Sequence, residues 1–154
     1  MIRFAFVALI VAITAGDAMA QSRVQTGVLE CRADPSIGLI LGSQRGLDCV
    51  FKPNRGPAQN YSGTQTRVGF DIGIRQDATI VWAVFSPTVQ IGPGELAGNY
   101  AGVSADAAVG LGVGANALIG GSNNSYALQP LSVEGQIGAN VGIGIAGLNL
   151  SFQR

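Results

Sequence analysis

Histidine is absent from this chain of 154 residues, and lysine occurs only once, at Lys52. Without histidine, the chain cannot build a Ser-His-Asp or Cys-His nucleophilic centre or a histidine-based metal site. Lys52 is followed by Pro-Asn and belongs to no Walker-type phosphate loop. The sequence therefore predicts a protein that is not an enzyme and that has no metal site and no cofactor.

Charged residues are also few (12%), and nine basic residues balance nine acidic ones. Because a chain without net positive charge attracts polyanions poorly, nucleic acid is not expected as a partner. The basic residues nevertheless gather in the first half of the chain, between Arg23 and Arg75. They form either an ordinary solvated surface or a basic face for lipid headgroups or anionic glycans.

Long apolar runs are lacking too, since no stretch reaches the roughly 18 apolar residues of a membrane helix. A shorter run over residues 4–13 follows Arg3 and precedes the small residues Ala18 and Ala20. This pattern is typical of a cleavable secretory signal peptide. We expect residues 1–20 to be removed after Ala20, and residues 21–154 to form a single domain in the periplasm or outside the cell.

Cysteine occurs at only two positions, Cys31 and Cys49. Because the compartment of an exported protein is oxidising, we predict that they form a disulfide, which would stabilise the fold by about 3 kcal/mol. A redox-active pair would normally be closer together, as in Cys-x-x-Cys. The spacing thus favours a structural bond.

Glycine, by contrast, is abundant (23 residues), and apolar residues alternate with polar or small ones over short segments. This pattern predicts an all-β domain, either a single small antiparallel β-barrel or a curled sandwich. We expect about eight to ten short strands and at most one short helix, with a helical turn near residues 93–99. Residues 79–85 are almost wholly apolar and predict a central strand that includes Trp82.

The apolar phase shifts by one residue at two places in the last third of the chain. One shift lies near Gln129 and Pro130, and the other follows Ile145, after which Leu148 and Leu150 continue the apolar face. Such a shift predicts a β-bulge or a bend. Bulges and strand glycines are the features that curl a sheet into a barrel.

Glycines alternate with apolar residues in two predicted strands, residues 111–119 and 139–152. Rows without side chains allow close approach by a backbone, an aromatic ring or an apolar ligand. They are interpreted as crowded barrel packing, as a groove or lumen for an acyl chain, or as a smooth face for self-association. A groove would be lined by Gly110, Gly112, Gly114, Gly142 and Gly144, with Trp82 nearby.

Arg67, Asp71 and Arg75 lie four residues apart, on one face of a strand predicted over residues 67–75. They predict an exposed row of charges that is either structural or a docking surface for a partner. A third alternative is an eight-stranded outer-membrane barrel, for which length and alternation suffice but clear aromatic girdles are lacking.

Several segments carry a family resemblance, among them TGVLEC (26–31), LDCVF (47–51), GFDIG (69–73) and ALQPLSVEGQ (127–136). Together with most of the chain after residue 20, they resemble the bacterial domain-of-unknown-function 992 family. This resemblance implies an exported setting and transfers no catalytic residues. More distantly, GFDIG, GVSADAAVGLGVG (102–114) and GANVGIGIAGL (138–148) are similar to SYLF-like periplasmic envelope-integrity proteins. That similarity implies a small β-barrel that serves envelope homeostasis through lipid contact.

The sequence as a whole therefore predicts an exported, periplasmic, non-enzymatic domain that binds a lipid or another apolar ligand. The alternative is a structural or protein-interaction factor of the cell envelope that has no small-molecule ligand. The two hypotheses place function on different residues, the glycine rows in the first case and the Arg67, Asp71 and Arg75 face in the second.

Overall fold

The computed structural model describes residues 23–38, 42–68, 73–75, 78–103, 108, 112–114, 116–133, 136–137 and 145–154. The strands are β1 (Val24–Ala33), β2 (Ser36–Gly38), β3 (Gly42–Pro53), β4 (Gln59–Val68), β5 (Gly73–Arg75), β6 (Ala78–Ser86), β7 (Gly98–Gly102), β8 (Leu118–Gly120), β9 (Tyr126–Val133), β10 (Gln136–Ile137) and β11 (Ile145–Gln153). A 3₁₀ turn, η1 (Ser122–Asn124), precedes β9.

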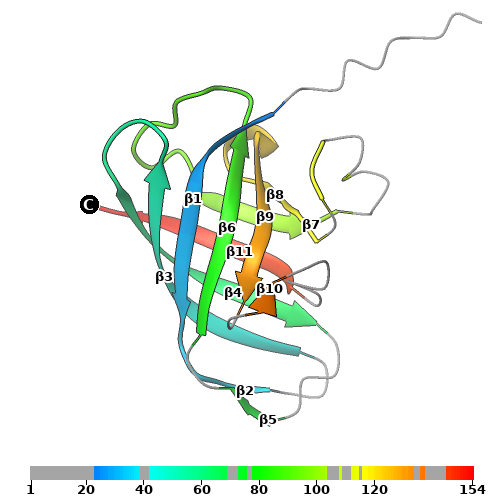
Figure 1. Cartoon of the computed structure of the whole chain (residues 1–154). Coiled ribbons are helices and arrows are strands. Elements are labelled where there is room, and N and C mark those ends of the chain that lie inside the picture. The colour runs from blue at the N-terminus through cyan, green and yellow to red at the C-terminus, as the bar shows by residue number, and fades with distance from the viewer. Residues whose placement is uncertain are drawn as a thin grey trace, which may run out of the picture.

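Eight strands form one antiparallel sheet that closes into a barrel, in the order β9-β6-β1-β3-β4-β11-β7-β8 (Figure 1). The sheet closes because β9 pairs with β6 on one side and with β8 on the other. β10 pairs with β9, and β2 pairs with β5 in a separate two-stranded sheet at the lower end of Figure 1. The all-β class and the antiparallel barrel predicted from the sequence are confirmed.

Side chains alternate between the inside and the outside of the barrel along its strands, as the pleat of a strand requires. In β1, Leu29 and Cys31 are buried, whereas Glu30 and Arg32 point outward. Large apolar side chains fill the interior, and the fully buried ones include Trp82, Tyr61, Phe51, Leu29, Ile80, Leu128 and Leu150. The interior is therefore mainly apolar, although it also contains the buried side chains of Arg45, Gln59 and Gln65.

Both bulges predicted from the shifts of the apolar phase are confirmed. The pairing of β11 with β4 skips Ala146, and the pairing of β9 with β6 skips Leu131. A third bulge, at Thr26 in β1, was not predicted. The buried Thr26 hydroxyl donates to the carbonyl oxygen of Val84 at 3.3 Å, so the extra residue has its own hydrogen bond to β6.

One local prediction is wrong, and a glycine with positive φ explains the difference. Gly112 has a φ of 73°, which a strand excludes, so the described part of residues 111–119 becomes a strand only at β8. The turn expected near residues 93–99 is found over residues 93–96, where the Ala97 amide donates to the carbonyl oxygen of Gly94 at 3.1 Å. β7 begins directly afterwards.

The segment before β8 packs on the outside of the barrel instead of joining the sheet. Ala108, Val113 and Ala117 form a small buried cluster with Ala127 of β9. Phe85 of β6 packs against this cluster from the outer face of the barrel. The strand over residues 79–85 is therefore central, as predicted. Its outer face is covered near Phe85 by this small cluster.

Candidate functional site

The predicted disulfide between Cys31 and Cys49 is confirmed and lies inside the barrel. The two residues are direct cross-strand partners on β1 and β3, with their Cα atoms 4.0 Å apart. Both belong to the main core cluster and are at most 3% exposed. The bond therefore joins two adjacent strands of the closed sheet at a place that solvent does not reach.

The residues of the predicted apolar groove lie in different environments. Trp82 is completely buried in the barrel interior, whereas Gly112 and Gly114 are exposed on the segment that precedes β8. Gly110, Gly142 and Gly144 lie outside the described residues. The groove stays a prediction.

The predicted interaction face is divided between two sheets. Arg67 is half-buried in β4 of the barrel, opposite Ile145 of β11, whereas Arg75 belongs to β5 and pairs with Ser36. Asp71 lies outside the described residues. Because β4 and β5 pair with different strands, a shared face of Arg67 and Arg75 does not follow from their spacing, and this face also stays a prediction.

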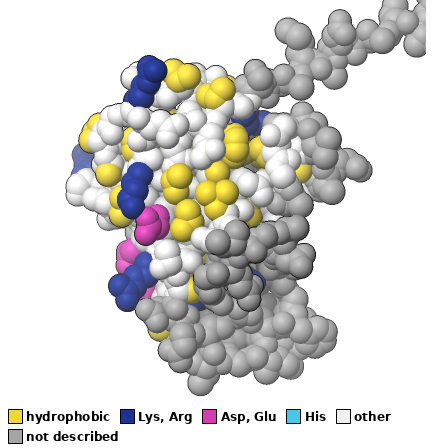
Figure 2. All heavy atoms as spheres, viewed as in Figure 1, with side chains coloured by type: hydrophobic (Ala, Val, Ile, Leu, Met, Phe, Trp, Pro, Cys, Tyr) yellow, Lys and Arg dark blue, Asp and Glu magenta, His cyan; other side chains and the backbone are white. Residues whose placement is uncertain are grey.

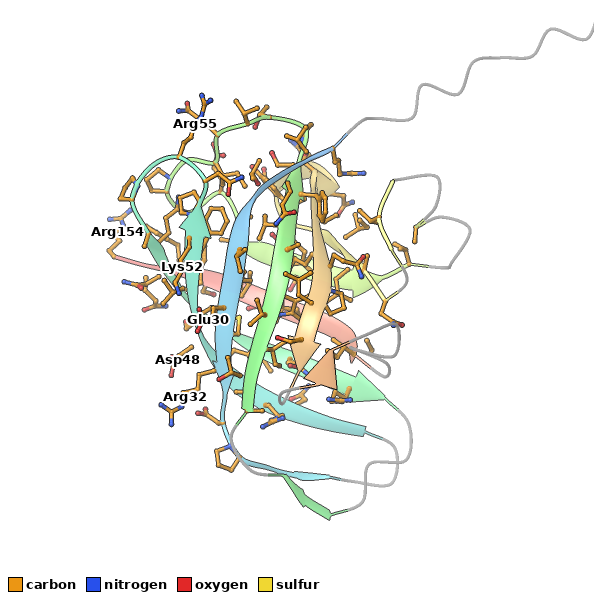
Figure 3. All side chains as sticks on the ribbon, in the orientation of Figure 1. Glu30, Arg32, Asp48, Lys52, Arg55 and Arg154 are labelled. Atoms are coloured by element: carbon orange, nitrogen blue, oxygen red, sulfur yellow. A yellow bond between two sulfur atoms is a disulfide. The ribbon has the colours of Figure 1, made fainter. Side chains whose placement is uncertain are left out.

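A different group of charges gathers on the outer side of β1 and β3. Figure 3 shows Lys52, Glu30, Asp48 and Arg32 following one another down one side of the barrel. Figure 2, viewed in the same orientation, shows dark blue and magenta side chains beside a group of hydrophobic ones. These four charges, together with the neighbouring half-buried residues Val28, Val50 and Val81, are called the charged face below.

The register of the strands explains this arrangement. Glu30 of β1 lies between Val50 of β3 and Val81 of β6, and Arg32 lies opposite Asp48. Lys52 reaches diagonally across the strands, and its Nζ atom lies 2.6 Å from Oε2 of Glu30. The Lys52 and Glu30 side chains thus form an ion pair across β1 and β3, although such an exposed pair contributes only about 0–1 kcal/mol to stability.

The charged face contains a hollow of about 320 Å³, lined by Glu30, Arg32, Asp48, Val50, Lys52 and Thr79. Its floor is the part of β1 and β3 that the disulfide joins, because Cys31 separates Glu30 from Arg32 and Cys49 follows Asp48. A covalent bond directly beneath the hollow restricts the movement of the two strands. The charges are therefore presented on a preorganised surface, which lowers the entropic cost of binding.

The sequence analysis missed the charged face, although the sequence contains a signal for it. In the segments LECR (29–32) and LDCVFK (47–52), charged residues stand immediately beside the two cysteines. Because neighbours on a strand point to opposite faces, a buried disulfide places these charges outside. The missing step was to pair the two segments in register through the cysteines.

Three tyrosines form hydrogen bonds to the loop of residues 87–97, which lies at the end of the barrel that is uppermost in Figure 1. The Tyr100 hydroxyl donates to the carbonyl oxygen of Leu96 at 2.7 Å, and the Tyr61 hydroxyl accepts from the Leu96 amide at 3.4 Å. The Tyr126 hydroxyl donates to Oε2 of Glu95 at 3.1 Å. With Leu96 fully buried below them, this loop closes the barrel end.

Burial raises the pKa of all three phenols. The pKa of Tyr61 and that of Tyr100 lie above the ordinary value of 10 chiefly because of desolvation. Desolvation, with the Glu95 carboxylate as a second cause, raises the pKa of Tyr126 to about 12. All three phenols therefore keep their protons near pH 7, so that each hydroxyl can donate a hydrogen bond. Tyr61 donates its hydrogen to Oε1 of Gln59 at 2.7 Å.

We expect the free energy of unfolding to fall as the pH rises above 10. In the unfolded chain, tyrosine loses its proton near pH 10, whereas the folded protein retains it to a higher pH. The stabilisation is thus complete below pH 10, and the part from Tyr126 is lost as the pH rises towards about 12. Urea unfolding at several pH values, with tyrosinate absorbance read in parallel, measures this loss. Tyr126→Phe should show a shallower decline, and equal slopes for both proteins would contradict the assignment to Tyr126.

Within the described residues, no group of three or more His, Cys, Asp or Glu side chains could hold a metal ion. The described part of the chain also contains no helix long and apolar enough to cross a membrane.

Comparison with known proteins identifies a family without assigning an activity. No curated protein and no solved structure matches this chain. One family model, described as "Protein of unknown function (DUF992)", matches residues 9–151. Because that match extends over nearly the entire sequence and includes both cysteine segments, the chain belongs to the DUF992 family.

Proposed function

We propose that this protein is an exported, non-enzymatic binding domain of the bacterial envelope and that its charged face docks a partner protein. The observation that carries the proposal is the hollow between Glu30, Arg32, Asp48 and Lys52, placed directly above the buried disulfide. Mixed charges around apolar residues are suited to a protein surface, because charge pairs select the partner while the apolar part is buried.

The filled interior favours recognition on the outside of the barrel. Trp82, Tyr61 and Phe51 are at most 2% exposed and occupy the space that a lumenal ligand would need. The large apolar residues exposed in the described part of the chain, Val24, Val89 and Leu131, lie on β1, the 87–97 loop and β9.

The exported setting rests on the segment of residues 1–20 and on the disulfide. A buried disulfide persists in an oxidising compartment, which supports the periplasm or the exterior. Intact mass spectrometry of the protein recovered from the periplasm tests this proposal. The mass of residues 21–154 would support cleavage after Ala20, whereas the mass of residues 1–154 would contradict it.

Binding of a lipid or another apolar ligand is the second candidate. The exposed Gly112 and Gly114 favour it, because positions without side chains allow an apolar ligand to approach closely. Native mass spectrometry before and after organic extraction distinguishes the two functions. A removable adduct of lipid mass would favour the carrier, whereas a clean protein mass favours recognition on the charged face.

The double variant Glu30→Lys with Lys52→Glu is expected to lose the partner protein and keep the fold. The exchange preserves an ion pair across β1 and β3 but reverses its polarity, so stability should change by less than about 1 kcal/mol. A partner with complementary charges would then meet like charges. Cross-linking in the envelope, followed by capture of the tagged protein, compares the partner recovered with each form.

Arg55→Glu is the matched control. Arg55 is exposed in the turn between β3 and β4, apart from the charged face, as Figure 3 shows. This substitution alters the net charge of the protein, whereas the Glu30 and Lys52 exchange does not. Loss of the partner in the exchange variant alone supports the charged face. Recovery of the same partner by the exchange variant would overturn the proposed function.

A further inference from the structure

A second hollow, of about 280 Å³, opens on the outer side of β4, β11 and β7. Its walls include Gln44, Thr64, Thr66, Asn99 and Asn149, and Gly147 lies among them. None of the residues that line it carries a charge, in contrast to the charged face. The two hollows share no residue, so this one, called the amide hollow below, can be considered independently.

The amide hollow exists because Gly147 presents no side chain at an outward position of β11. Its register partners are Thr66 on β4 and Ala101 on β7, and the bulge at Ala146 directly precedes it. A Cβ atom built on Gly147 would lie 3.4 Å from the carbonyl oxygen of Tyr100, which is ordinary contact. Neither packing nor a positive φ therefore requires glycine here.

Side chains around Gly147 offer both donors and acceptors of hydrogen bonds. The Nδ2 atom of Asn149 donates to Oδ1 of Asn99 at 2.7 Å, and both residues are exposed. This bond fixes the two amides side by side, so that the Asn99 amide group can donate further while the Asn149 carbonyl oxygen can accept. The hydroxyls of Thr64 and Thr66 on the neighbouring strand can do either.

We propose that the amide hollow binds a neutral saccharide. A sugar hydroxyl both donates and accepts, which matches paired amides and threonine hydroxyls, and an acetamido group matches an asparagine amide. An anionic ligand would find no cation in this lining, and a cation would find no carboxylate. The volume lies just below the range of about 300–1,000 Å³ for drug-sized ligands, which suits one sugar ring.

The affinity should be weak, because the hollow offers no aromatic ring for stacking. Tyr100 contributes to its floor, but its side chain is 2% exposed and its hydroxyl is bonded to Leu96 inside the barrel. Hydrogen bonds to an exposed surface replace hydrogen bonds to water and yield little net free energy. We expect a dissociation constant on the order of 1 mM.

The test is a titration of the oxidised protein, followed by ¹⁵N–¹H NMR of backbone and side-chain amides. The probes are triacetylchitotriose and maltotriose, each added to about 10 mM, which would saturate a site with a dissociation constant of ~1 mM. At least one probe should move the side-chain amide signals of Asn99 and Asn149 and the backbone signal of Gly147. Absence of saturable shifts with both probes would overturn the proposal.

Two variants test the amide hollow, one by filling it and the other by removing one of its hydrogen-bonding groups. Gly147→Val places a side chain in it, and Asn149→Ala removes an exposed amide without burying anything. Each should weaken binding at least about tenfold. The matched control is Gly102→Val on β7, where a Cβ atom would approach no atom closer than 3.9 Å and which does not line the hollow. Wild-type affinity in Asn149→Ala would overturn the proposal even if Gly147→Val failed to fold.

Two further comparisons separate this inference from the proposed function. The Glu30 and Lys52 exchange variant should bind the saccharide as the wild type does, because its substitutions lie on the charged face. Trigalacturonic acid, an anionic trisaccharide, should not bind. Equal shifts with the anionic and neutral probes would overturn the assignment to a neutral ligand. Failure of the partner test at the charged face would leave this titration unaffected.

Discussion

Removal of the Cys31–Cys49 bond should lower the free energy of unfolding by about 3 kcal/mol. The bond closes a loop across a sequence separation of 18 residues, and in the chain-entropy model that closure mainly restricts the unfolded chain. For a domain of this size, the loss corresponds to a fall in melting temperature of roughly 10 °C.

Chemical denaturation of Cys31→Ala/Cys49→Ala beside the wild type measures this effect. The wild type with its disulfide reduced is the control, since it keeps both sulfur atoms in the core and loses only the covalent bond. The double variant should be less stable than the reduced wild type, because it also leaves a cavity where two buried side chains stood. A decrease of less than about 0.5 kcal/mol in the free energy of unfolding on reduction would contradict this prediction. The hydrogen bonds between β1 and β3 would then hold the two strands together without the covalent bond.

The same experiment bears on the charged face. If the disulfide preorganises the hollow between Glu30 and Arg32, reduction should weaken partner binding under conditions in which the barrel remains folded. The effect would come from greater freedom of β1 and β3 and not from any change in charge. Partner capture by reduced, folded protein therefore distinguishes a structural role of the bond from a role in both structure and binding.

Local patterns were sufficient to predict the class of the fold. The alternation of apolar and polar residues has a period of two, which is typical of strands, and the continuous apolar run over residues 79–85 located the central strand of Trp82. The phase shifts located the bulges at Ala146 and Leu131, because a bulge must move every later side chain to the other face. These features depend on neighbouring residues, so one sequence contains them.

The order of the strands and the surface could not be predicted in this way. β11 lies between β4 and β7, and that neighbourhood depends on contacts between distant segments. Gly112 follows the same alternation as a strand glycine, yet its positive φ places it in a turn outside the sheet. Likewise, the charged face and the amide hollow each combine residues from at least three strands, so neither forms a motif within one segment.

The burial of Trp82 distinguishes a barrel that is filled by its own side chains from a barrel that encloses a ligand cavity. Trp82 is 0% exposed and lies in the main core cluster with Leu29, its partner on β1. A tryptophan that lined a ligand cavity would have solvent or ligand beside it. A tryptophan that fills the interior has protein atoms on all sides, and its removal must leave a cavity.

Trp82→Ala should therefore destabilise the protein by about 3–5 kcal/mol, the range for removing a large aromatic side chain from a packed core. Trp82→Phe is the matched control, because it keeps most of the apolar volume. The Trp82 Nε1 atom has no hydrogen-bond partner among the described residues, so Trp82→Phe removes a donor that makes no bond there. We expect this variant to lose less than about 1.5 kcal/mol.

Urea unfolding of both variants, followed by far-ultraviolet circular dichroism, measures the difference. A large loss for Trp82→Ala with a small one for Trp82→Phe means that the ring acts through its volume, which supports recognition on the outer surface. A decrease of less than about 1 kcal/mol in the free energy of unfolding of Trp82→Ala would contradict the filled interior, because removing a fully packed tryptophan leaves a cavity that destabilises the protein by more than this. In that case the interior would again be the first place to search for an apolar ligand.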